Sequence, residues 1–303
     1  MEYVIETKNL TKKYGSSTVV DNINLHVPKG KIYGLLGRNG AGKTTTMKMM
    51  LKLIKVTEGN INLFGEDFRN NNIYKKIGSI IETPGFYQNL TARDNLKLLA
   101  KLHGNITDKE VQEALEIVGL HKEDKKTFSN FSLGMKQRLG IAAAIMHNPE
   151  LLILDEPING LDPIGISEIR SFLLSLSHDK GVTIFISSHV LSEIEQIADV
   201  IGVMNNGKLV EEVNILELQE KLKHYIEITV SDTKLAEKVL KDNFSIKDYS
   251  IIDNTIYIYD KNKSISDINK SLVQNNISVT KLNPCKENLE DYFENLIGGG
   301  GIA

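Results

Sequence analysis

The sequence predicts an α/β domain over residues 1–219, followed by a small α+β domain over residues 220–297. In the first part, short β-branched runs alternate with helical stretches, which is typical of a sheet covered by helices. The second part follows the order strand, helix, strand, strand, helix, strand. A chain of 303 residues is long enough for one large and one small domain.

The predicted strands of the first domain fall into two groups. Short runs bounded by turn residues predict an antiparallel β subdomain from residues 3–10, 18–27 and 61–64. Continuous apolar runs predict buried parallel strands at residues 31–36, 151–154, 183–186 and 200–204. We therefore expect a core that contains a mixed sheet.

Between these strands, residues from about 85 to 148 have an almost wholly helical pattern and predict an inserted helical subdomain. Its first helix is expected to begin at Thr91, because Asp94 three residues later matches a capping box. It is expected to end at Gly104, which follows His103.

The small domain resembles a split βαβ, or ferredoxin-like, unit. Its strands are predicted at residues 225–230, 249–252, 255–259 and 277–282. Asp253 and Asn254 supply a hairpin turn, and a last helix is expected over residues 286–296. With no titratable cluster or glycine-rich loop, this is interpreted as an accessory domain that serves either regulation or dimer contact. Residues 298–303 are expected to be disordered.

Composition excludes several classes of protein. The net charge is only −3, so we expect no binding to nucleic acid. Cys285 is the single cysteine, which excludes an intrachain disulfide or a zinc site built of cysteines. The N-terminus lacks the pattern of a signal peptide, and the apolar runs fall short of the ~20 residues that a spanning helix needs. We expect a cytoplasmic protein whose membrane role requires a partner.

One motif predicts a phosphate-binding loop between a strand and a helix. Residues 37–45 match GxxxxGK[ST] and are all expected to bind nucleotide: Gly37, Arg38, Asn39, Gly40, Ala41, Gly42, Lys43, Thr44 and Thr45. The glycines allow backbone N–H groups and the positive end of the next helix to face phosphate oxygens. Lys43 would place its ammonium on those oxygens, and the Thr44 hydroxyl would bind Mg²⁺. The sequence therefore predicts ATP and Mg²⁺ as ligands.

A second motif supplies chemistry, because the apolar run at 151–154 ends in two carboxylates. Successive side chains of a strand point to opposite faces, so Asp155 and Glu156 are expected to have different tasks. Asp155 would hold Mg²⁺, and Glu156 would polarise a water that attacks the terminal phosphate.

Residues 131–139, Phe-Ser-Leu-Gly-Met-Lys-Gln-Arg-Leu, resemble the signature sequence of ABC ATPases, whose usual form is LSGGQ. The resemblance continues in residues 159–162, Asn-Gly-Leu-Asp, which are similar to the D-loop, and in His189, which is similar to the switch histidine. Tyr14 falls where that family stacks an aromatic ring on adenine. The resemblance covers nearly all of residues 1–219 and implies an ABC-type ATPase fold.

The resemblance also implies a head-to-tail dimer, either of two identical subunits or of a related pair. The nucleotide held by one copy would be closed by residues of the other, which are Ser132, Gly134, Met135 and Asp162. His189 would contact the same phosphate from its own side. The family works with polytopic permease subunits, so we expect a protein peripheral to the inner face of the cell membrane.

Two departures from the family pattern stand out. Leu133 and Met135 replace the usual glycine and glutamine of the signature, which makes that loop bulkier. Glu82 stands where a glutamine is usual, nine residues before Thr91. An ionised glutamate only accepts hydrogen bonds and adds a negative charge. Glu82 is therefore interpreted as a catalytic residue that binds Mg²⁺ and couples the ATP state to the partner.

Glu82, the signature variant and the ending Leu289-Glu290-Asp291-Tyr292-Phe293 together resemble ATPases of lantibiotic immunity and bacitracin-type peptide resistance. This implies export or expulsion of antimicrobial peptides. The alternatives are an ABC ATPase for another exported substrate and a non-transport ABC ATPase. A regulatory module that holds ATP without hydrolysis is disfavoured by Lys43, Asp155, Glu156 and His189.

Overall fold

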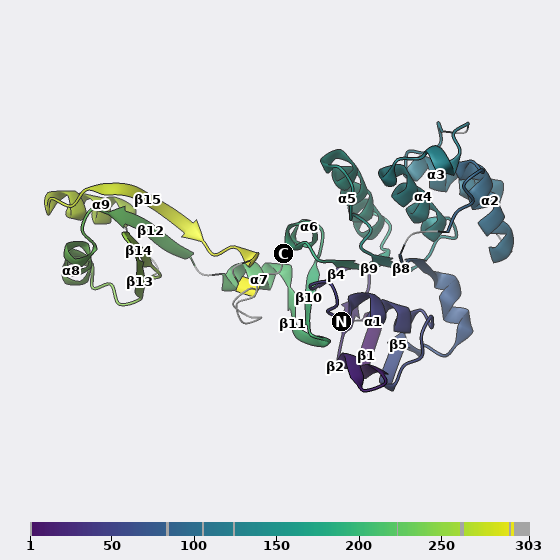
Figure 1. Ribbon diagram of the computed structural model, residues 1–303, viewed down its shortest axis with the longest axis horizontal. Helices are drawn as coiled ribbons and strands as arrows, with labels where there is room; N and C mark the ends of the chain where they lie inside the picture. Colours follow the sequence, from purple (N-terminus) through teal and green to yellow (C-terminus); the bar gives the residue numbers. More distant parts are fainter. Residues whose placement is uncertain are drawn as a thin grey trace. The chain divides into compact units, whose positions relative to one another are not determined.

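The computed structural model describes residues 2–82, 85–104, 106–123, 125–222, 224–260, 264–290 and 292–293. These residues form two compact units, the first reaching Glu217 and the second starting at Leu218 (Figure 1). Helix α7 (Ile215–Lys221) contains this division. The tail at 298–303, for which we predict disorder, lies outside the described residues.

A six-stranded mixed sheet forms the centre of the first unit, which confirms the predicted core. Its order is β11-β10-β4-β9-β8-β7, parallel except for the antiparallel pair of β10 and β11. The bounds are β4 (Ile32–Leu36), β7 (Ile77–Ile80), β8 (Leu151–Asp155), β9 (Thr183–Ser188), β10 (Val200–Asn205) and β11 (Lys208–Asn214). Every residue of β4, β8 and β9 is buried, as their continuous apolar pattern predicts.

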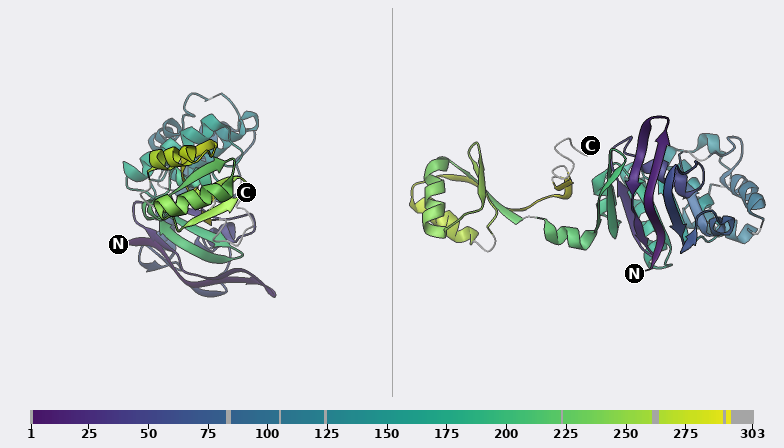
Figure 2. Two further views of the ribbon diagram at one scale, coloured as in Figure 1. Left: turned by 90° about the vertical axis from the view of Figure 1, so that its left-hand side faces the viewer. Right: turned by 90° about the horizontal axis from the view of Figure 1, so that it is seen from below.

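A second, antiparallel sheet follows the order β2-β1-β5-β6, with β3 also paired to β1. Its strands are β1 (Tyr3–Tyr14), β2 (Ser17–Ile23), β3 (His26–Pro28), β5 (Glu58–Leu63) and β6 (Glu66–Asp67). The right-hand view of Figure 2 shows β1 and β2 side by side. The single run predicted over 18–27 is wrong, because the chain leaves the strand conformation at Asn24 and Leu25 and so divides into β2 and β3.

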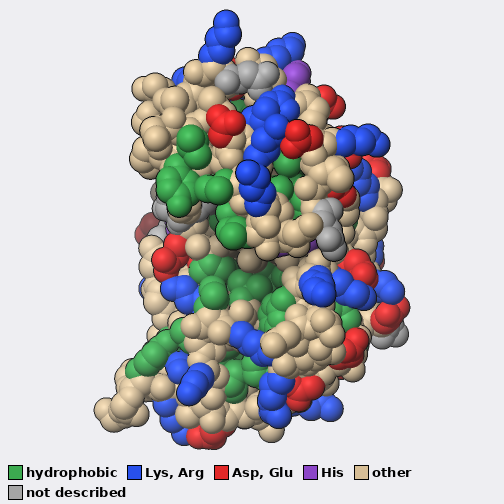
Figure 3. Space-filling view, turned by 90° about the vertical axis from the view of Figure 1, so that its right-hand side faces the viewer, with side chains coloured by type: hydrophobic (Ala, Val, Ile, Leu, Met, Phe, Trp, Pro, Cys, Tyr) green, Lys and Arg blue, Asp and Glu red, His purple; other side chains and the backbone are tan. Residues whose placement is uncertain are grey.

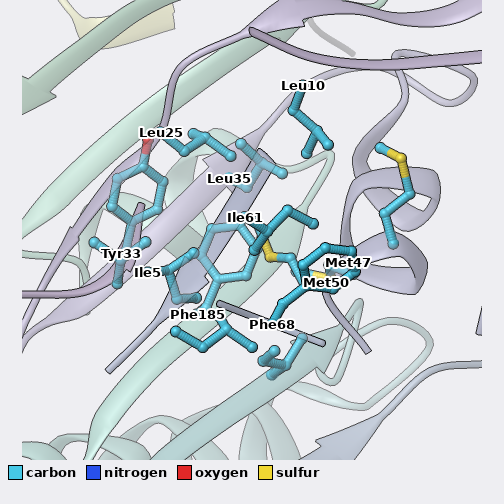
Figure 4. Packing of buried hydrophobic residues seen from close by; sticks show 14 of the residues in the cluster. Ile5, Leu10, Leu25, Tyr33, Leu35, Met47, Met50, Ile61, Phe68 and Phe185 are labelled. Atoms are coloured by element: carbon cyan, nitrogen blue, oxygen red, sulfur yellow. The ribbon is translucent and has the colours of Figure 1, made fainter. Parts of the chain in front are cut away.

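Helix α1 (Lys43–Met50) packs between the two sheets and completes the main hydrophobic core (Figure 4). Met47 and Met50 of this helix meet Ile5 and Ile61 from one sheet and Phe185 from the other. Residues widely separated in the sequence therefore share one core, and it fixes α1 against the central strands.

A partly buried hydrogen-bond network joins β3, β4 and β11. The Tyr33 hydroxyl of β4 donates to Glu212 Oε1 of β11 at 2.7 Å, and His26 Nδ1 of β3 lies 2.8 Å from Glu212 Oε2. Burial is the main cause that raises the pKa of Tyr33 well above its usual value, and the nearby Glu212 carboxylate raises it further. The tyrosine thus remains a protonated donor inside the core.

Helices α5 (Pro163–His178) and α6 (Leu191–Glu195) pack on β9, and α6 also packs on β4. The helical part contains α2 (Ala92–His103), α3 (Asp108–Ile117) and α4 (Leu133–Ile145), and two short 3-10 helices are η1 (Asn71–Lys76) and η2 (Phe128–Asn130). The predicted limits of α2 are confirmed, since Thr91 accepts from the Asp94 N–H and Gly104 ends the helix at φ 84°. A complete capping box also starts α3, between Thr107 and Glu110.

The second unit contains β12 (His224–Val230), α8 (Thr233–Phe244), β13 (Tyr249–Ile252), β14 (Thr255–Ile258), α9 (Ile265–Gln274) and β15 (Val279–Lys286). The four strands form an antiparallel sheet in the order β13-β14-β12-β15. These elements follow the predicted order, while the ferredoxin-like assignment stays a prediction. The last helix cannot start at Lys286, because this residue pairs with His224 inside the sheet.

His147 lies just after α4 in a partly buried position. Its Nε2 atom is 3.1 Å from the Ile77 carbonyl oxygen, and its ring stacks on that of His103 with centroids 5.0 Å apart. Burial lowers the pKa of His147. The hydrogen bond to the Ile77 carbonyl raises this pKa in part, and the neighbouring His103 lowers it further. The folded protein therefore favours the neutral ring.

This depressed pKa predicts a loss of stability in mild acid. As the pH falls below about 6.5, the ordinary histidine value, the unfolded chain takes up a proton that the folded chain resists. His147→Gln removes this titration, so its stability relative to the wild-type chain should improve between pH 7.5 and 5.5. Urea unfolding followed by circular dichroism measures the difference, which should be constant above pH 8. A difference that does not change with pH would contradict the prediction.

Candidate active site

Residues 37–42 form a loop between β4 and α1, and two of its glycines are required by geometry. A Cβ atom on Gly37 would lie 2.5 Å from the Met204 carbonyl oxygen of β10, so only glycine fits this approach. Gly42 adopts a φ of 106° at the N-cap of α1. The loop therefore leads directly into the N-terminal end of α1, whose first N–H groups have no partner within the helix and can bind an anion held by the loop.

Within this loop the exposed residues are Arg38, Asn39 and Gly40, whereas Ala41 and Gly42 are buried against the core. Thr44 and Thr45 are partly buried in the first turn of α1. The sequence motif and the strand, loop and helix around it agree, as the phosphate-loop prediction requires.

Lys43 is folded back into the loop. Its Nζ atom donates to the Gly37 carbonyl oxygen at 2.5 Å and lies 3.3 Å from Glu156 Oε1. Only 5% of this side chain is exposed, so the ammonium is held at the opening by these oxygens. Phosphate oxygens at the loop would offer the same ammonium a more strongly charged partner.

The two carboxylates at the end of β8, Asp155 within it and Glu156 just after it, have different partners, as predicted from strand alternation. Asp155 Oδ2 accepts from the Thr44 hydroxyl at 2.7 Å, and Asp155 Oδ1 accepts from the Ser187 hydroxyl at 2.6 Å. Glu156 Oε2 lies 2.7 Å from His189 Nδ1. Asp155 thus joins α1, β8 and β9, while Glu156 lies between Lys43 and His189.

Ser187 is a site residue that the motifs do not identify. Besides donating to Asp155, its Oγ accepts the Glu156 backbone N–H at 3.0 Å. It therefore orients both carboxylate residues from the neighbouring strand, in register with Asp155. Its position two residues before His189 is the only signal that the sequence offers.

Glu82 follows β7 and forms an ion pair with Lys48 Nζ at 2.5 Å. Lys48 lies one helical turn after Thr44 on α1, so the two side chains project from the same helix face. Thr44 and Asp155 are brought together, but Glu82 is bound to Lys48 instead of to them. Among the described residues, no cluster of three or more His, Cys, Asp or Glu side chains could hold a metal ion.

The signature residues lie at the start of α4. Ser132 is the N-cap and accepts from the Met135 N–H at 3.3 Å. Gly134 is the second residue of α4. The Met135 side chain is only 8% exposed, and its sulfur lies 3.6 Å from Lys126 Nζ. The Met135 side chain, predicted to bind nucleotide, is therefore buried within its own subunit.

Residues 159–162 contact this signature loop. Leu133 is 50% exposed, and one of its methyl carbons lies 2.8 Å from where a Cβ on Gly160 would be placed. Asp162 caps α5 by accepting from the Gly165 N–H at 3.0 Å. Tyr14, at the end of β1, is 52% exposed, with Lys12 Nζ 4.6 Å from its ring centroid.

The family comparison agrees with this geometry. The ABC transporter family matches residues 20–159. The whole chain is 66% identical to the bacitracin transport ATP-binding protein BcrA of Enterococcus faecalis, of which it covers 99%. This chain belongs to the ATP-binding proteins of ABC transporters.

Other relatives of this ABC ATPase share less of its length. The lantibiotic transport ATP-binding protein SrtF of Streptococcus pyogenes is 47% identical over 69% of this chain and 90% of that protein. A solved ATP binding subunit of an ABC transporter is 28% identical, with a TM-score of 0.64, over 72% of this chain and 92% of that one. The predicted ABC-type ATPase fold of the first unit, the enzyme class and ATP as substrate are thereby confirmed.

The contacts of Ser187 predict its effect on ATP hydrolysis. Ser187→Ala removes a hydrogen bond to each carboxylate residue, and bonds to charged groups contribute about 1.5–3 kcal/mol. We expect kcat of this ABC ATPase to fall by about 10-fold to 100-fold, with ATP affinity changed much less. Steady-state hydrolysis and equilibrium nucleotide binding measure the two effects separately.

Ser188→Ala is the matched control, because the Ser188 hydroxyl contacts Val190 and Glu193 and neither carboxylate of the site. An equal loss of kcat in both variants would contradict a specific role for Ser187.

Proposed function

We propose that this ABC ATPase drives export or expulsion of antimicrobial peptides, and of bacitracin-type peptides in particular. The observation that carries the proposal is 66% identity over both units to a bacitracin transport ATP-binding protein. The lower identity to SrtF, a lantibiotic transport ATP-binding protein, extends over a smaller share of the chain. Bacitracin is therefore the first peptide to test, and a lantibiotic the second.

We infer that hydrolysis uses Glu156 as the base that accepts a proton from the attacking water. Lys43 would bind the phosphates, and the donors for Mg²⁺ would be the Thr44 hydroxyl and Asp155 carboxylate, an oxygen pair that suits this hard cation. When bound, the ion supplies positive charge to the phosphate oxygens. Because Lys43 contacts Glu156, transfer of its ammonium to phosphate would leave Glu156 Oε1 available to water.

His189 would orient Glu156 and contact the terminal phosphate. Its Nδ1 atom is already 2.7 Å from Glu156 Oε2, which leaves the opposite ring nitrogen as the group for phosphate. Tyr14 would stack on adenine with its exposed ring.

The site would be completed by a second copy arranged head to tail. Ser132 and Gly134 lie at the N-terminal end of α4, where backbone N–H groups favour an anion. The contact between Leu133 and Gly160 would make residues 159–162, including Asp162, move with the signature loop. Both segments would then close together on the nucleotide of the partner.

Separate permease subunits would form the peptide path and hold this chain at the inner face of the membrane. On the face in Figure 3, hydrophobic side chains gather in a hollow across the middle of the first unit. Exposed apolar residues of α2 include Leu98 and Leu102, with Tyr87 just before the helix. Apolar side chains of this kind suit a protein contact better than solvent.

The chemistry and the cargo can be tested in one pair of experiments. Glu156→Gln should lower kcat by about 100-fold or more while ATP binding is retained, because the proton acceptor is removed. In a sensitive bacterium that produces the cognate permeases, the wild-type chain should raise the inhibitory concentration of bacitracin, and Glu156→Gln should not.

Protection against a lantibiotic alone would move the cargo to that class, and protection against neither peptide would contradict peptide export. Undiminished hydrolysis by Glu156→Gln would contradict the mechanism.

Glu82 is proposed to couple the metal site to the permeases by exchanging Lys48 for Mg²⁺. Residues 44 and 48 are one helical turn apart, a rise of about 6 Å, so a small movement of Glu82 along α1 would suffice. Glu82→Ala should therefore raise the Mg²⁺ concentration needed for half-maximal ATPase and reduce bacitracin resistance. Lys48→Gln is the control, since it breaks the ion pair and keeps the carboxylate.

If Glu82→Ala leaves both ATPase and resistance intact, this role is wrong. Equal changes in both variants would assign the effect to the ion pair alone.

A further inference from the structure

Among the described residues of the second unit, one edge of the sheet is open to another strand. In the order β13-β14-β12-β15, strands β13 and β15 are the edges. The Tyr259 N–H donates to the Asp248 carbonyl oxygen, and Ser250 and Ile252 pair with Tyr257 and Thr255. Since hydrogen bonding alternates along an antiparallel pair, the peptide groups of Tyr249 and Ile251 point away from β14.

The two edges differ in how they resist pairing. The β15 edge contains Lys281, Pro284 and Lys286, and charged residues and proline are the usual protection of an edge strand. β13 reads Tyr-Ser-Ile-Ile, with Ile251 37% and Ile252 60% exposed. It therefore presents an unprotected edge with apolar side chains.

We propose that β13 pairs with β13 of a second copy of this chain, about a two-fold axis. An antiparallel register centred on Ser250 places Tyr249 of each copy opposite Ile251 of the other. These are the residues whose peptide groups point outward, so each pair exchanges two hydrogen bonds. The outward N–H and C=O groups of each β13 edge are then paired with those of the other, and the two sheets form one continuous sheet.

The flanking charges select this register. Lys247 lies two residues before β13 and Asp253 in the turn just after it, at φ 51°, and both side chains are exposed. Centring on Ser250 therefore brings Lys247 of one copy to the end of the paired strands where Asp253 of the other lies, and the two-fold axis produces this contact between opposite charges twice. Moving the centre by one residue to Ile251 would place Asp253 opposite Tyr249 and lose both charge pairs.

A contact between two strands of four residues is too small to hold a dimer by itself, since stable interfaces bury about 1,200 Å² or more. This inference rests on the proposed head-to-tail pairing of the first unit, which would bring two second units to a high effective concentration. The paired strands would then stabilise the assembly between ATP cycles. Of the two roles left open by the sequence, this assigns dimer contact to the second unit.

Disulfide trapping tests the register in the full-length chain. In a Cys285→Ser background, Ser250→Cys places two cysteines in a non-hydrogen-bonded pair, with Cα atoms about 4.5 Å apart and within the range of a disulfide. We expect a disulfide-linked dimer under mild oxidation. Ile252→Cys is the matched control on the same sheet face, because the same register separates its two sulfurs by four residues, about 13 Å.

Trapping by Ser250→Cys but not by Ile252→Cys supports the proposal, and trapping by neither or by both at equal rates overturns it. Adding Lys247→Glu should slow trapping by Ser250→Cys about threefold or more at low salt, and Asp253→Lys should restore it. ATP-dependent association of Glu156→Gln in the Cys285→Ser background reports the pairing of the first unit. If that association persists while trapping fails, the strand pairing alone is wrong.

Discussion

The site depends on one carboxylate, because Asp155 binds side chains from two other elements at once. Thr44 of α1 and Ser187 of β9 both donate to it, at 2.7 and 2.6 Å. This is possible because β9 lies between β4 and β8, so the carboxyl ends of three parallel strands meet at one edge. The order of strands, fixed by the core around Phe185 and α1, therefore determines where the chemistry can occur.

The sequence was sufficient to predict the residues of this site that lie in local motifs. The phosphate loop and the pair Asp155 and Glu156 each occupy one short segment, so spacing alone identifies them. Ser187 could not be found in this way, because its role comes from the register between β8 and β9. The pairing of Glu82 with Lys48 likewise joins residues 34 positions apart through the fold, and no local pattern indicates it.

The departures in the signature loop have a structural explanation in the same unit. Leu133 is larger than the usual glycine, and its methyl group occupies the space beside Gly160, whose φ of 76° also favours glycine. A side chain at 160 would meet that methyl group at 2.8 Å, so the bulk of one loop is accommodated by the absence of a side chain in the other. The two loops are therefore matched in shape, although the residue pattern differs from the family's.

Helix α1 carries two lysines that each hold a carboxylate from the end of a parallel strand. Lys43 holds Glu156 after β8, and Lys48 holds Glu82 after β7. Both glutamates have positive φ, 47° and 63°, which is uncommon outside glycine and requires support from surrounding contacts. A nucleotide that draws Lys43 to its phosphates removes one of these supports directly. Since both lysines belong to one short helix, the same element supports the glutamate at the end of β8 and the one at the end of β7.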